Sequence, residues 1–448
     1  MANTVFYGKL KDDRKSISWG DILSESFKKH DRMDKDRLLA VGTAAWKVND
    51  GNMLSKWRKP WLWTRLLLVF IALTAVAVVG LHFFRDESIF YTLTMVVVPL
   101  ALPLVELVLI WELNIPQNVS LWDIIIYFLL GGFLSLLFSI AGVYIAGSIN
   151  PQIVENASIV APLAEEPGKL IAVLIFISVV KNRNNGKIYG ITGLVIGAAV
   201  GAGFSAFESI MYVLQEYGQQ AVIATSDVMN GYVVGEVGIG DILNYGMSES
   251  LHVVLVRMLP ALGGHIQYAA PYAAALAYGS GVGKRSGVFT LRFLFAFALS
   301  FVLHAVWDSD ISLGGYFVLI LILWAILLYW VNKCMKEVYA AGTSKAASMP
   351  VIRWLYGPFA GQNMTVTTGV SMHIGRATGN QVVFPADTVG VSREHCVLRA
   401  NPDLTIEDCG SSAGTFVDGK KLTPHTLKRL AAGQKVALGS SKNSFEVM

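Results

Sequence analysis

Long apolar runs recur through most of this 448-residue chain. Each run holds about 20 residues, which is long enough to cross the hydrocarbon of a bilayer as a helix with a rise of about 1.5 Å per residue. Tryptophans stand near the ends of several runs, as is typical of residues at a membrane interface. We therefore predict about eight transmembrane helices, at 61–84, 89–113, 121–147, 159–180, 188–214, 262–281, 288–307 and 315–332.

The charges of the loops orient these helices. Lys and Arg gather in the N-terminal segment and in the loops at 181–187, 284–292 and 333–336, whereas the loop at 215–249 contains neither. Basic loops that alternate with loops lacking Lys and Arg follow the positive-inside rule for an even number of spans. We therefore expect a multi-pass protein with both termini in the cytoplasm.

The pattern changes near residue 350. A small, polar stretch is followed by short β-branched runs that Gly, Asn, Asp and Ser turns separate, and this pattern predicts a β-sandwich of about seven or more strands. The fold class is thus a polytopic α-helical membrane domain followed by an all-β domain. We place a cytoplasmic N-terminal segment at 1–59, the membrane domain at 60–335, a linker at 336–350 and the β-sandwich at 351–448.

The composition excludes an ordinary soluble protein and a small disulfide-rich domain. Charged residues make up 15% of the chain and the mean hydropathy is +0.51, whereas charged residues are about 25% of an ordinary soluble domain. The chain has 3 cysteines, all at or after the last apolar run, which are too few for a disulfide framework and form no metal-like cluster. Nothing in the sequence predicts nucleic-acid binding.

One apolar run, at 159–180, carries Glu165, Glu166 and Lys169. Each costs about 2.5 to 3.5 kcal/mol to insert into a bilayer, so such groups usually face one another or a wet cavity. Lys169 follows Glu165 by one helical turn and can pair with it. Pro167 should loosen the helix between them. A buried structural ion pair would explain these residues alone, whereas a functional site requires partners on other helices.

Three further predicted helices carry such partners: Phe204 with Glu208, then His265, then His304 with Asp308. Phe204 and Glu208 stand one turn apart, as do His304 and Asp308, so each pair shares a helix face. In the predicted topology all of these side chains fall in the outer third of the bilayer. We therefore expect one pocket of acids, imidazoles and a lysine, which is equipped to activate water and to protonate an amide leaving group.

These motifs together resemble the PrsW family of intramembrane proteases, within the superfamily that includes the CAAX-prenyl endopeptidases. The family pattern is EExxK, FxxxE, a mid-chain Arg with a His, and HxxxD. It matches, in order, Glu165 with Glu166 and Lys169, Phe204 with Glu208, Arg257 with His265, and His304 with Asp308. The resemblance implies an endopeptidase that cleaves membrane-protein substrates, such as an anti-sigma factor, near the outer membrane face.

Two mechanisms remain open for such a site. In a metal-free form, Glu165 or Glu166 acts as general base on a water and the other acid carries the proton. The supporting roles of polarising the carbonyl, orienting an imidazole and tuning the acids then fall to His265 and His304, to Asp308 and to Lys169. In a metal-assisted form, the zinc candidates are Glu208, His265 and His304. The tight HExxH spacing of many zinc proteases is not found in the sequence.

The C-terminal region resembles a forkhead-associated (FHA) domain. The resemblance rests on Ile374 to Arg376, Ser392 to His395, Asp408 to Phe416, Asp418 with Gly419, and Leu438 with Gly439. FHA domains bind phosphothreonine in peptides. The resemblance implies that the phosphate is bound by Arg376, Ser392, Arg393 and Ser412, whose guanidinium and hydroxyl donors suit it. We expect His395 to brace the loops from within.

One position departs from the FHA pattern. The family usually has an Asn where Ala413 stands, and that Asn holds the peptide backbone. Its loss should weaken the grip on the peptide or change the side-chain preference, while the phosphate contacts are kept. The alternative is a sandwich that no longer binds phosphopeptides.

Together the two regions predict a protease of the bacterial plasma membrane that Ser/Thr kinase signalling recruits or regulates. Its expected partners are the lipid bilayer, a membrane-protein substrate and a phosphothreonine-containing protein or peptide. The alternative is a phosphosignal-reading scaffold, or a proton or ion transporter, without protease activity. A transporter should carry ionisable groups through the whole depth of the membrane, whereas these cluster at one level.

Overall fold

The structure is a computed structural model, and it describes residues 19–43, 46, 48, 53–84, 88–230, 262–347, 349–367, 370–400 and 403–448. The chain divides into two compact units. One contains most of the chain up to Tyr339, and the other contains Ala340–Met448 together with a short piece of the N-terminal region.

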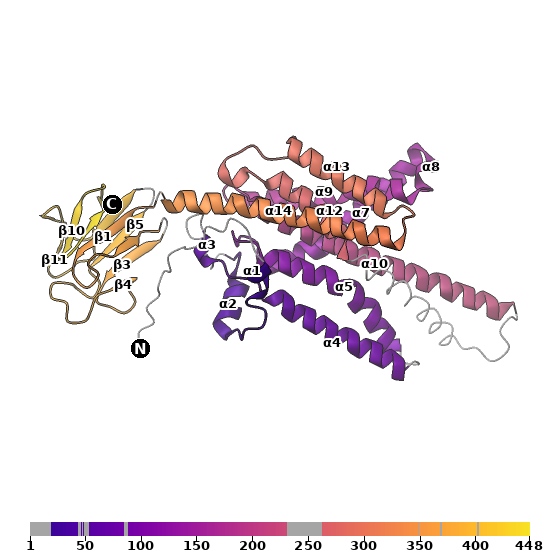
Figure 1. The fold of residues 1–448 in the computed structure, drawn as a ribbon, viewed down its shortest axis with the longest axis horizontal. Helices are drawn as coiled ribbons and strands as arrows, with labels where there is room; N and C mark the ends of the chain where they lie inside the picture. Colours follow the sequence, from indigo (N-terminus) through magenta and orange to yellow (C-terminus); the bar gives the residue numbers. More distant parts are fainter. Residues whose placement is uncertain are drawn as a thin grey trace. The chain divides into compact units, whose positions relative to one another are not determined.

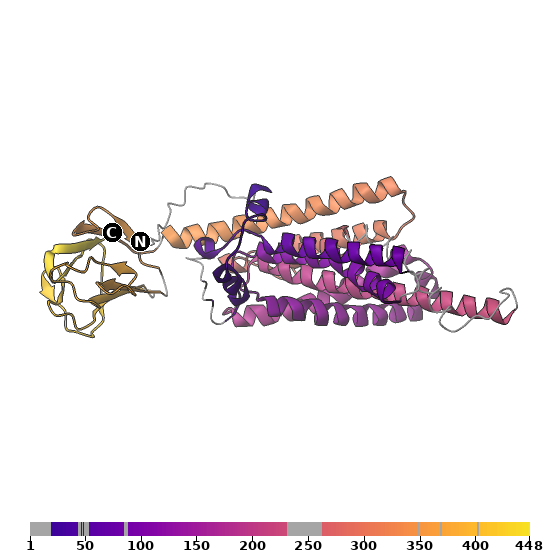
Figure 2. The same ribbon diagram turned by 90° about the horizontal axis from the view of Figure 1, so that it is seen from below.

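Long apolar helices build the first unit, where they run side by side (Figures 1 and 2). They are α4 (Leu62–Phe83), α5 (Ser88–Glu112), α6 (Leu121–Ile126) with a π-helical turn (Tyr127–Gly131) and α7 (Gly132–Ile149), α9 (Ala157–Arg183), α10 (Gly190–Met229), α12 (His265–Ala277), α13 (Leu291–Trp307) and α14 (Leu313–Ala347). Its shorter helices are α1 (Trp19–Leu23), α2 (Arg32–Ala40), α8 (Pro151–Val154) and a 3-10 turn (Ser280–Val282), whereas α3 (Met53–Lys56) belongs to the second unit.

Several of these helices could cross a membrane. Among the described residues, 5 helices are long and apolar enough to do so: Leu62–Phe83, Ile89–Glu112, Leu121–Ile149, Gly190–Asp227 and Leu313–Gly342. The helix α13 is apolar but shorter, and α12 has 13 residues. The apolar helices indicate a membrane protein, while the count of about eight spans stays a prediction.

Two helices extend beyond their predicted bounds. The helix α9 runs through Pro162 and Pro167 to Arg183, and the expected loosening of the backbone at Pro167 stays a prediction. The helix α14 continues to Ala347, so most of the predicted linker at 336–350 is helical. Good helix formers such as Lys, Glu and Ala fill this part of the sequence.

A row of glycines lets α10 approach α12 closely. A Cβ on Gly193, Gly197 or Gly201 would stand 2.4, 2.6 or 2.3 Å from a backbone carbonyl oxygen of α12, and the last of these oxygens belongs to His265. The glycines are four residues apart and therefore share one face of α10. Small residues at this spacing allow two membrane helices to pack backbone to backbone. The close approach brings Glu208, further along α10, against the start of α12.

The second unit contains the predicted β-sandwich, which is confirmed. One sheet has the order β2-β1-β11-β10-β7-β8 and the other β4-β3-β5-β6-β9. All neighbouring strands are antiparallel except β3 and β4. The strands are β1 (Val351–Tyr356), β2 (Asn363–Thr365), β3 (Ser371–Gly375), β4 (Val382–Val383), β5 (Cys396–Ala400), β6 (Leu404–Asp408), β7 (Thr415–Val417), β8 (Lys420–Lys421), β9 (Lys428–Arg429), β10 (Lys435–Leu438) and β11 (Ser440–Val447).

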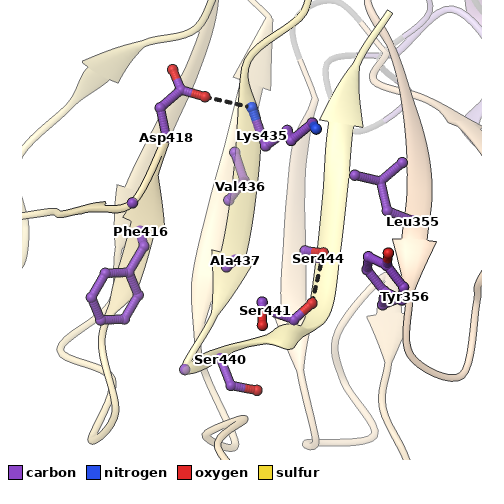
Figure 3. Close-up of a pocket in the computed structure, with 12 residues that line it drawn as sticks. Leu355, Tyr356, Phe416, Asp418, Lys435, Val436, Ala437, Ser440, Ser441 and Ser444 are labelled. Atoms are coloured by element: carbon purple, nitrogen blue, oxygen red, sulfur yellow. Dashed lines mark hydrogen bonds between the residues drawn. The ribbon is translucent and has the colours of Figure 1, made fainter.

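The core of the sandwich contains Trp354, whose ring lies 5.4 Å from that of Phe384 and 5.1 Å from that of Phe445. A pocket of about 470 Å³ lies on the six-stranded sheet and is lined by residues that include Leu355, Phe416 and Ser444 (Figure 3). The four predicted phosphate-site residues do not line this pocket. The sandwich therefore offers two separate surfaces, the loops and this sheet face.

Candidate active site and phosphate-binding loops

Four helices bring the predicted ionisable side chains of the membrane unit together. The contributors are Glu165, Glu166 and Lys169 from α9, Glu208 from α10, His265 from α12, and His304 with Asp308 at the end of α13. Every one of these side chains has an oxygen or nitrogen within 3.7 Å of another member of the set. The structure therefore brings all seven into one cluster. Arg257 lies outside the described residues.

Glu166 is held from two sides. Its Oε1 lies 2.7 Å from the ammonium of Lys169 and 2.7 Å from Nδ1 of His304. Glu166 and Lys169 are both fully buried. Because a buried carboxylate is costly unless it is paired and hydrogen-bonded, these contacts fix Glu166 as the partner that orients the His304 imidazole.

The contacts of His265 define its tautomer. Its Nδ1 lies 2.8 Å from Nζ of Lys169, and an ammonium group can only donate hydrogen bonds. Nδ1 therefore accepts, and the proton of the neutral ring sits on Nε2. That N–H donates to Oε2 of Glu208 at 3.0 Å.

Glu165 stands between the two imidazoles. Its Oε2 lies 3.7 Å from Nδ1 of His265 and 3.6 Å from Nε2 of His304. The ammonium of Lys169 is 3.4 Å from the same oxygen. Oδ2 of Asp308 lies 3.2 Å from the same Nε2 of His304. The side chains of Glu165, Glu208 and Asp308 keep 13%, 12% and 25% exposure, whereas that of Glu166 is fully buried, so Asp308 is the most exposed acid of the cluster.

Two aromatic rings pack against the cluster. Phe204 of the FxxxE motif lies with its ring centre 4.5 Å from the ammonium of Lys169 and 4.7 Å from the His265 ring. Tyr268 stacks on His304 at 4.8 Å with an angle of 13° between the rings. Sequence reasoning missed Tyr268, although it follows His265 by three residues and therefore shares its helix face.

The structure groups a different carboxylate with the two imidazoles from the one predicted for zinc. Ligand atoms of Glu165, His265 and His304 all lie within 4.8 Å of one another, whereas the predicted set had Glu208 in place of Glu165. Glu208 instead binds Nε2 of His265, the nitrogen that points away from Glu165. The donor set of two imidazoles and one carboxylate fits a catalytic zinc ion.

The outer contacts of the imidazoles also fit a metal. Each ring presents one nitrogen to Glu165 and gives the other to a carboxylate, Glu166 for His304 and Glu208 for His265. Histidines that bind metals usually donate their second N–H in this way, which fixes the tautomer and the ring orientation. The ammonium of Lys169 lies beside Nδ1 of His265 and Oε2 of Glu165. A metal bound by these two atoms would therefore have to displace the ammonium from them.

The predicted phosphate-binding residues of the sandwich lie on loops that backbone groups hold. The Arg376 guanidinium donates to the carbonyls of Val391 and Ala386, and the backbone N–H of Arg376 donates to the carbonyl of Ser392 at 3.0 Å. Oγ of Ser392 accepts from the backbone N–H of Ser412 at 3.0 Å and lies 3.4 Å from Oγ of Ser412. The side chain of Arg393 is exposed.

Two buried residues brace these loops. His395 is fully buried, and its Nδ1 accepts from the backbone N–H of Ser392 at 3.0 Å, as expected. Asp408 accepts from the backbone of Gly410 and Ser411 at 2.9 Å each, and from the hydroxyl of Thr415. Burial raises the pKa of Asp408, but these hydrogen bonds outweigh it and hold the pKa below the usual 3.8.

Comparisons with known proteins divide the chain in the same way. Residues 119–331 match the model of the PrsW family of intramembrane metalloproteases, and residues 372–439 match the FHA domain. The chain therefore joins a membrane region that matches the PrsW family to a C-terminal region that matches the FHA domain. The PrsW match contains all seven residues of the cluster, while α4 and α5 lie outside it.

Solved structures similar to the chain are FHA domains. The FHA domain of an Arabidopsis thaliana hypothetical protein is 27% identical, with 22% of this chain and 83% of that chain covered and a TM-score of 0.21. The FHA domain of the CT664 protein from Chlamydia trachomatis is 25% identical, with 22% and 95% covered and a TM-score of 0.20. No curated protein matches the chain.

Proposed function

We propose that this PrsW-family protein is an intramembrane endopeptidase that hydrolyses membrane-protein substrates near the outer face of a bacterial plasma membrane. The observation that carries the proposal is the position of Glu165, with Oε2 3.7 Å from Nδ1 of His265 and 3.6 Å from Nε2 of His304. The family description as intramembrane metalloproteases supports the class of reaction. The outer face follows from the loop charges, and an anti-sigma factor is one kind of substrate that would suit this location.

Glu165, His265 and His304 would hold a zinc ion. When bound, zinc polarises a carbonyl and activates water. Glu166 and Glu208 keep the two imidazoles in the tautomers that direct a lone pair toward Glu165. Lys169 lies 2.7 Å from Glu166. Its ammonium could therefore stay paired with that carboxylate and leave Nδ1 of His265 free to bind the metal.

Asp308 is the carboxylate that we assign to proton transfer. Hydrolysis forms a bond between the water oxygen and the carbonyl carbon, breaks the C–N bond, and moves one proton from the water to the leaving nitrogen. The carboxylate of Asp308 can take that proton and return it, because its side chain is the most exposed acid of the set, although its Oδ2 is buried beside Nε2 of His304. This assignment revises the roles predicted from sequence, since Glu166 is occupied by Lys169 and His304.

The test uses full-length protein reconstituted with a panel of single-span membrane proteins. Wild-type protein should cleave at least one of them, and Glu165→Gln should remove cleavage. Glu155→Gln is the matched control, because Glu155 is an exposed acid at the end of α8. If Glu165→Gln cleaves as fast as wild type, Glu165 does not take part in the reaction.

We also propose that the FHA domain binds phosphothreonine and so recruits or regulates the peptidase. The family match supports this assignment, as do the donors gathered at the loops. The guanidinium of Arg376, fixed by Val391 and Ala386, stands on loops that also carry the hydroxyls of Ser392 and Ser412. A phosphate accepts charge-assisted hydrogen bonds from such groups.

A titration with phosphothreonine peptides tests this role. Arg376→Ala should weaken binding about 10- to 100-fold, since a hydrogen bond to a charged group contributes about 1.5 to 3 kcal/mol. Arg353→Ala is the control, because Arg353 is exposed on β1. Equal affinity of the Arg376→Ala variant and the wild type would contradict the proposed phosphate site.

A further inference from the structure

The helix α5 holds a buried carboxylate that no predicted motif contains. Glu106 is only 6% exposed and lies within the candidate span Ile89–Glu112, outside the residues that match the PrsW family. An acid at such a position costs about 2.5 to 3.5 kcal/mol to insert and therefore usually marks a function. Its partner indicates what that function is.

Glu106 binds the amide of Gln267. Nε2 of Gln267 donates to Oε2 of Glu106 at 2.9 Å, and both side chains are buried. Oε1 of Gln267 accepts from the backbone N–H of Gly264 at 3.0 Å, and its Nε2 also lies 3.4 Å from the carbonyl of Leu262. Gln267 therefore ties α5 to the turn at 262–264 that precedes α12.

This turn sets the direction of the His265 side chain, because His265 is the first residue of α12. Its imidazole makes two short contacts, 2.8 Å to Nζ of Lys169 and 3.0 Å to Oε2 of Glu208. A small rotation of the turn would lengthen both. The contact that Gln267 makes with Gly264 fixes the backbone immediately before the imidazole.

We propose that Glu106, acting through Gln267, is a positioning residue that holds the His265 imidazole in the active site. Glu106 orients the Gln267 amide so that Oε1 faces Gly264, and the turn then presents His265 to Lys169 and Glu208. This inference deepens the proposed peptidase function and rests on it, since His265 belongs to that site.

A second contact keeps the turn attached when the first is removed. Nε1 of Trp324, on α14, donates to the carbonyl of Leu262, and a Cβ on Gly263 would stand 2.7 Å from the side chain of Ile320 on the same helix. Because α14 still holds the turn, loss of the Glu106 contact should change the orientation of His265 without unfolding the helices.

The test reads the histidine directly and does not need a substrate. Full-length protein with ¹⁵N-labelled histidine is reconstituted in lipid nanodiscs, and the ring resonances of His265 and His304 are assigned among the 8 histidines with His265→Asn and His304→Asn variants. In wild-type protein His265 should show one tautomer, with the proton on Nε2, because its hydrogen bonds select it. Thermal unfolding is measured alongside.

Glu106→Leu should move the two ring resonances of His265 toward each other, as the two tautomers mix, and leave those of His304 in place. Glu106→Gln should resemble wild type, since an amide oxygen can still accept from Gln267. Gln267→Glu should perturb His265, because two carboxylates would then face each other, and adding Glu106→Gln to it should restore the wild-type spectrum.

Unchanged His265 resonances in Glu106→Leu would overturn the proposal, as would equal shifts of His265 and His304. If Glu106→Leu does not fold, the double variant Glu106→Gln with Gln267→Glu is the deciding test. Its failure to restore the wild-type spectrum would overturn the proposal. A normal spectrum in wild-type protein that cleaves no membrane substrate would count against the peptidase function alone. The two failures are therefore distinguishable.

Discussion

The membrane unit and the FHA domain both gather polar side chains for a ligand, but they hold them by different means. In the membrane unit the side chains come from four helices and bind one another, as Glu166 does with Lys169 and His304 at 2.7 Å each. In the FHA domain the side chains lie on loops and backbone groups hold them, as the carbonyl of Val391 holds Arg376.

The difference predicts how each site responds to substitution. Where charged groups support one another in a low-dielectric interior, removing one leaves its partners unpaired, so single changes should have large and coupled effects. Where a rigid sandwich supports each loop residue separately, single changes should have smaller and more local effects. Substitutions in the two sites therefore test this contrast.

Replacing His304 by Ala should have the largest effect. The protein should lose bound metal and its cleavage rate should fall about 1000-fold, since a metal ion contributes several kcal/mol to the transition state. The metal content of purified protein is measured by mass spectrometry beside cleavage assays with and without a chelator. His82→Ala is the control, because His82 is exposed on α4. Full cleavage by metal-free protein would contradict the metal-assisted mechanism and favour the metal-free one, in which Glu165 acts as general base.

Replacing Asp308 by Asn should separate proton transfer from metal binding. Asp308 contacts His304 but is not one of the three residues grouped as metal donors. We expect the cleavage rate to fall about 100-fold, the lower range for loss of a general acid–base group, while the metal content stays at the wild-type level. Loss of metal together with activity would show instead that Asp308 is needed for the metal site.

Sequence reasoning identified every residue of the cluster and two of its contacts, Lys169 with Glu165 and Asp308 with His304, but not which carboxylate faces both imidazoles. Glu165 and Glu208 are both one turn from another motif residue along the chain, so spacing could not say which of them faces both imidazoles. That choice depends on the approach of α10 to α12, which the glycines at 193, 197 and 201 determine. Glu106 was missed because it lies in an otherwise apolar run and its partner Gln267 is 161 residues away.

The FHA domain was easier to predict, because its signature residues act close to one another in sequence. Ser392 and His395 stand three residues apart and bind each other directly, and Asp408 binds Gly410 and Ser411 in the same loop. The helical extension of α14 was missed because small polar residues are typical of linkers as well as of exposed helices.

Replacing Ala413 by Asn should strengthen phosphopeptide binding. The resemblance to FHA domains assigns a peptide-backbone contact to an Asn at this position, and one neutral hydrogen bond contributes about 0.5 to 1.5 kcal/mol. We therefore expect about 2- to 10-fold tighter binding in a titration, with cleavage of a membrane substrate in the absence of phosphopeptide unchanged. Unaltered affinity would mean that the departure at Ala413 does not limit the grip on the peptide.

The smallest predicted effect is a loosening of the FHA loops in acid. Burial lowers the pKa of His395 below its usual 6.5, so the unfolded domain binds a proton on this residue at a higher pH than the folded one. The free energy of unfolding therefore decreases as the pH falls below about 6.5, and it decreases further once the pH falls below the usual 3.8 of Asp408, whose pKa is also lowered.

Hydrogen exchange of the full-length protein should show less protection at Ser392 at pH 5.5 than at pH 7.5, after correction for intrinsic rates. His425→Gln, at an exposed histidine, should keep this pH dependence. Equal protection at the two pH values would mean that the imidazole does not carry the support that the Ser392 contact implies.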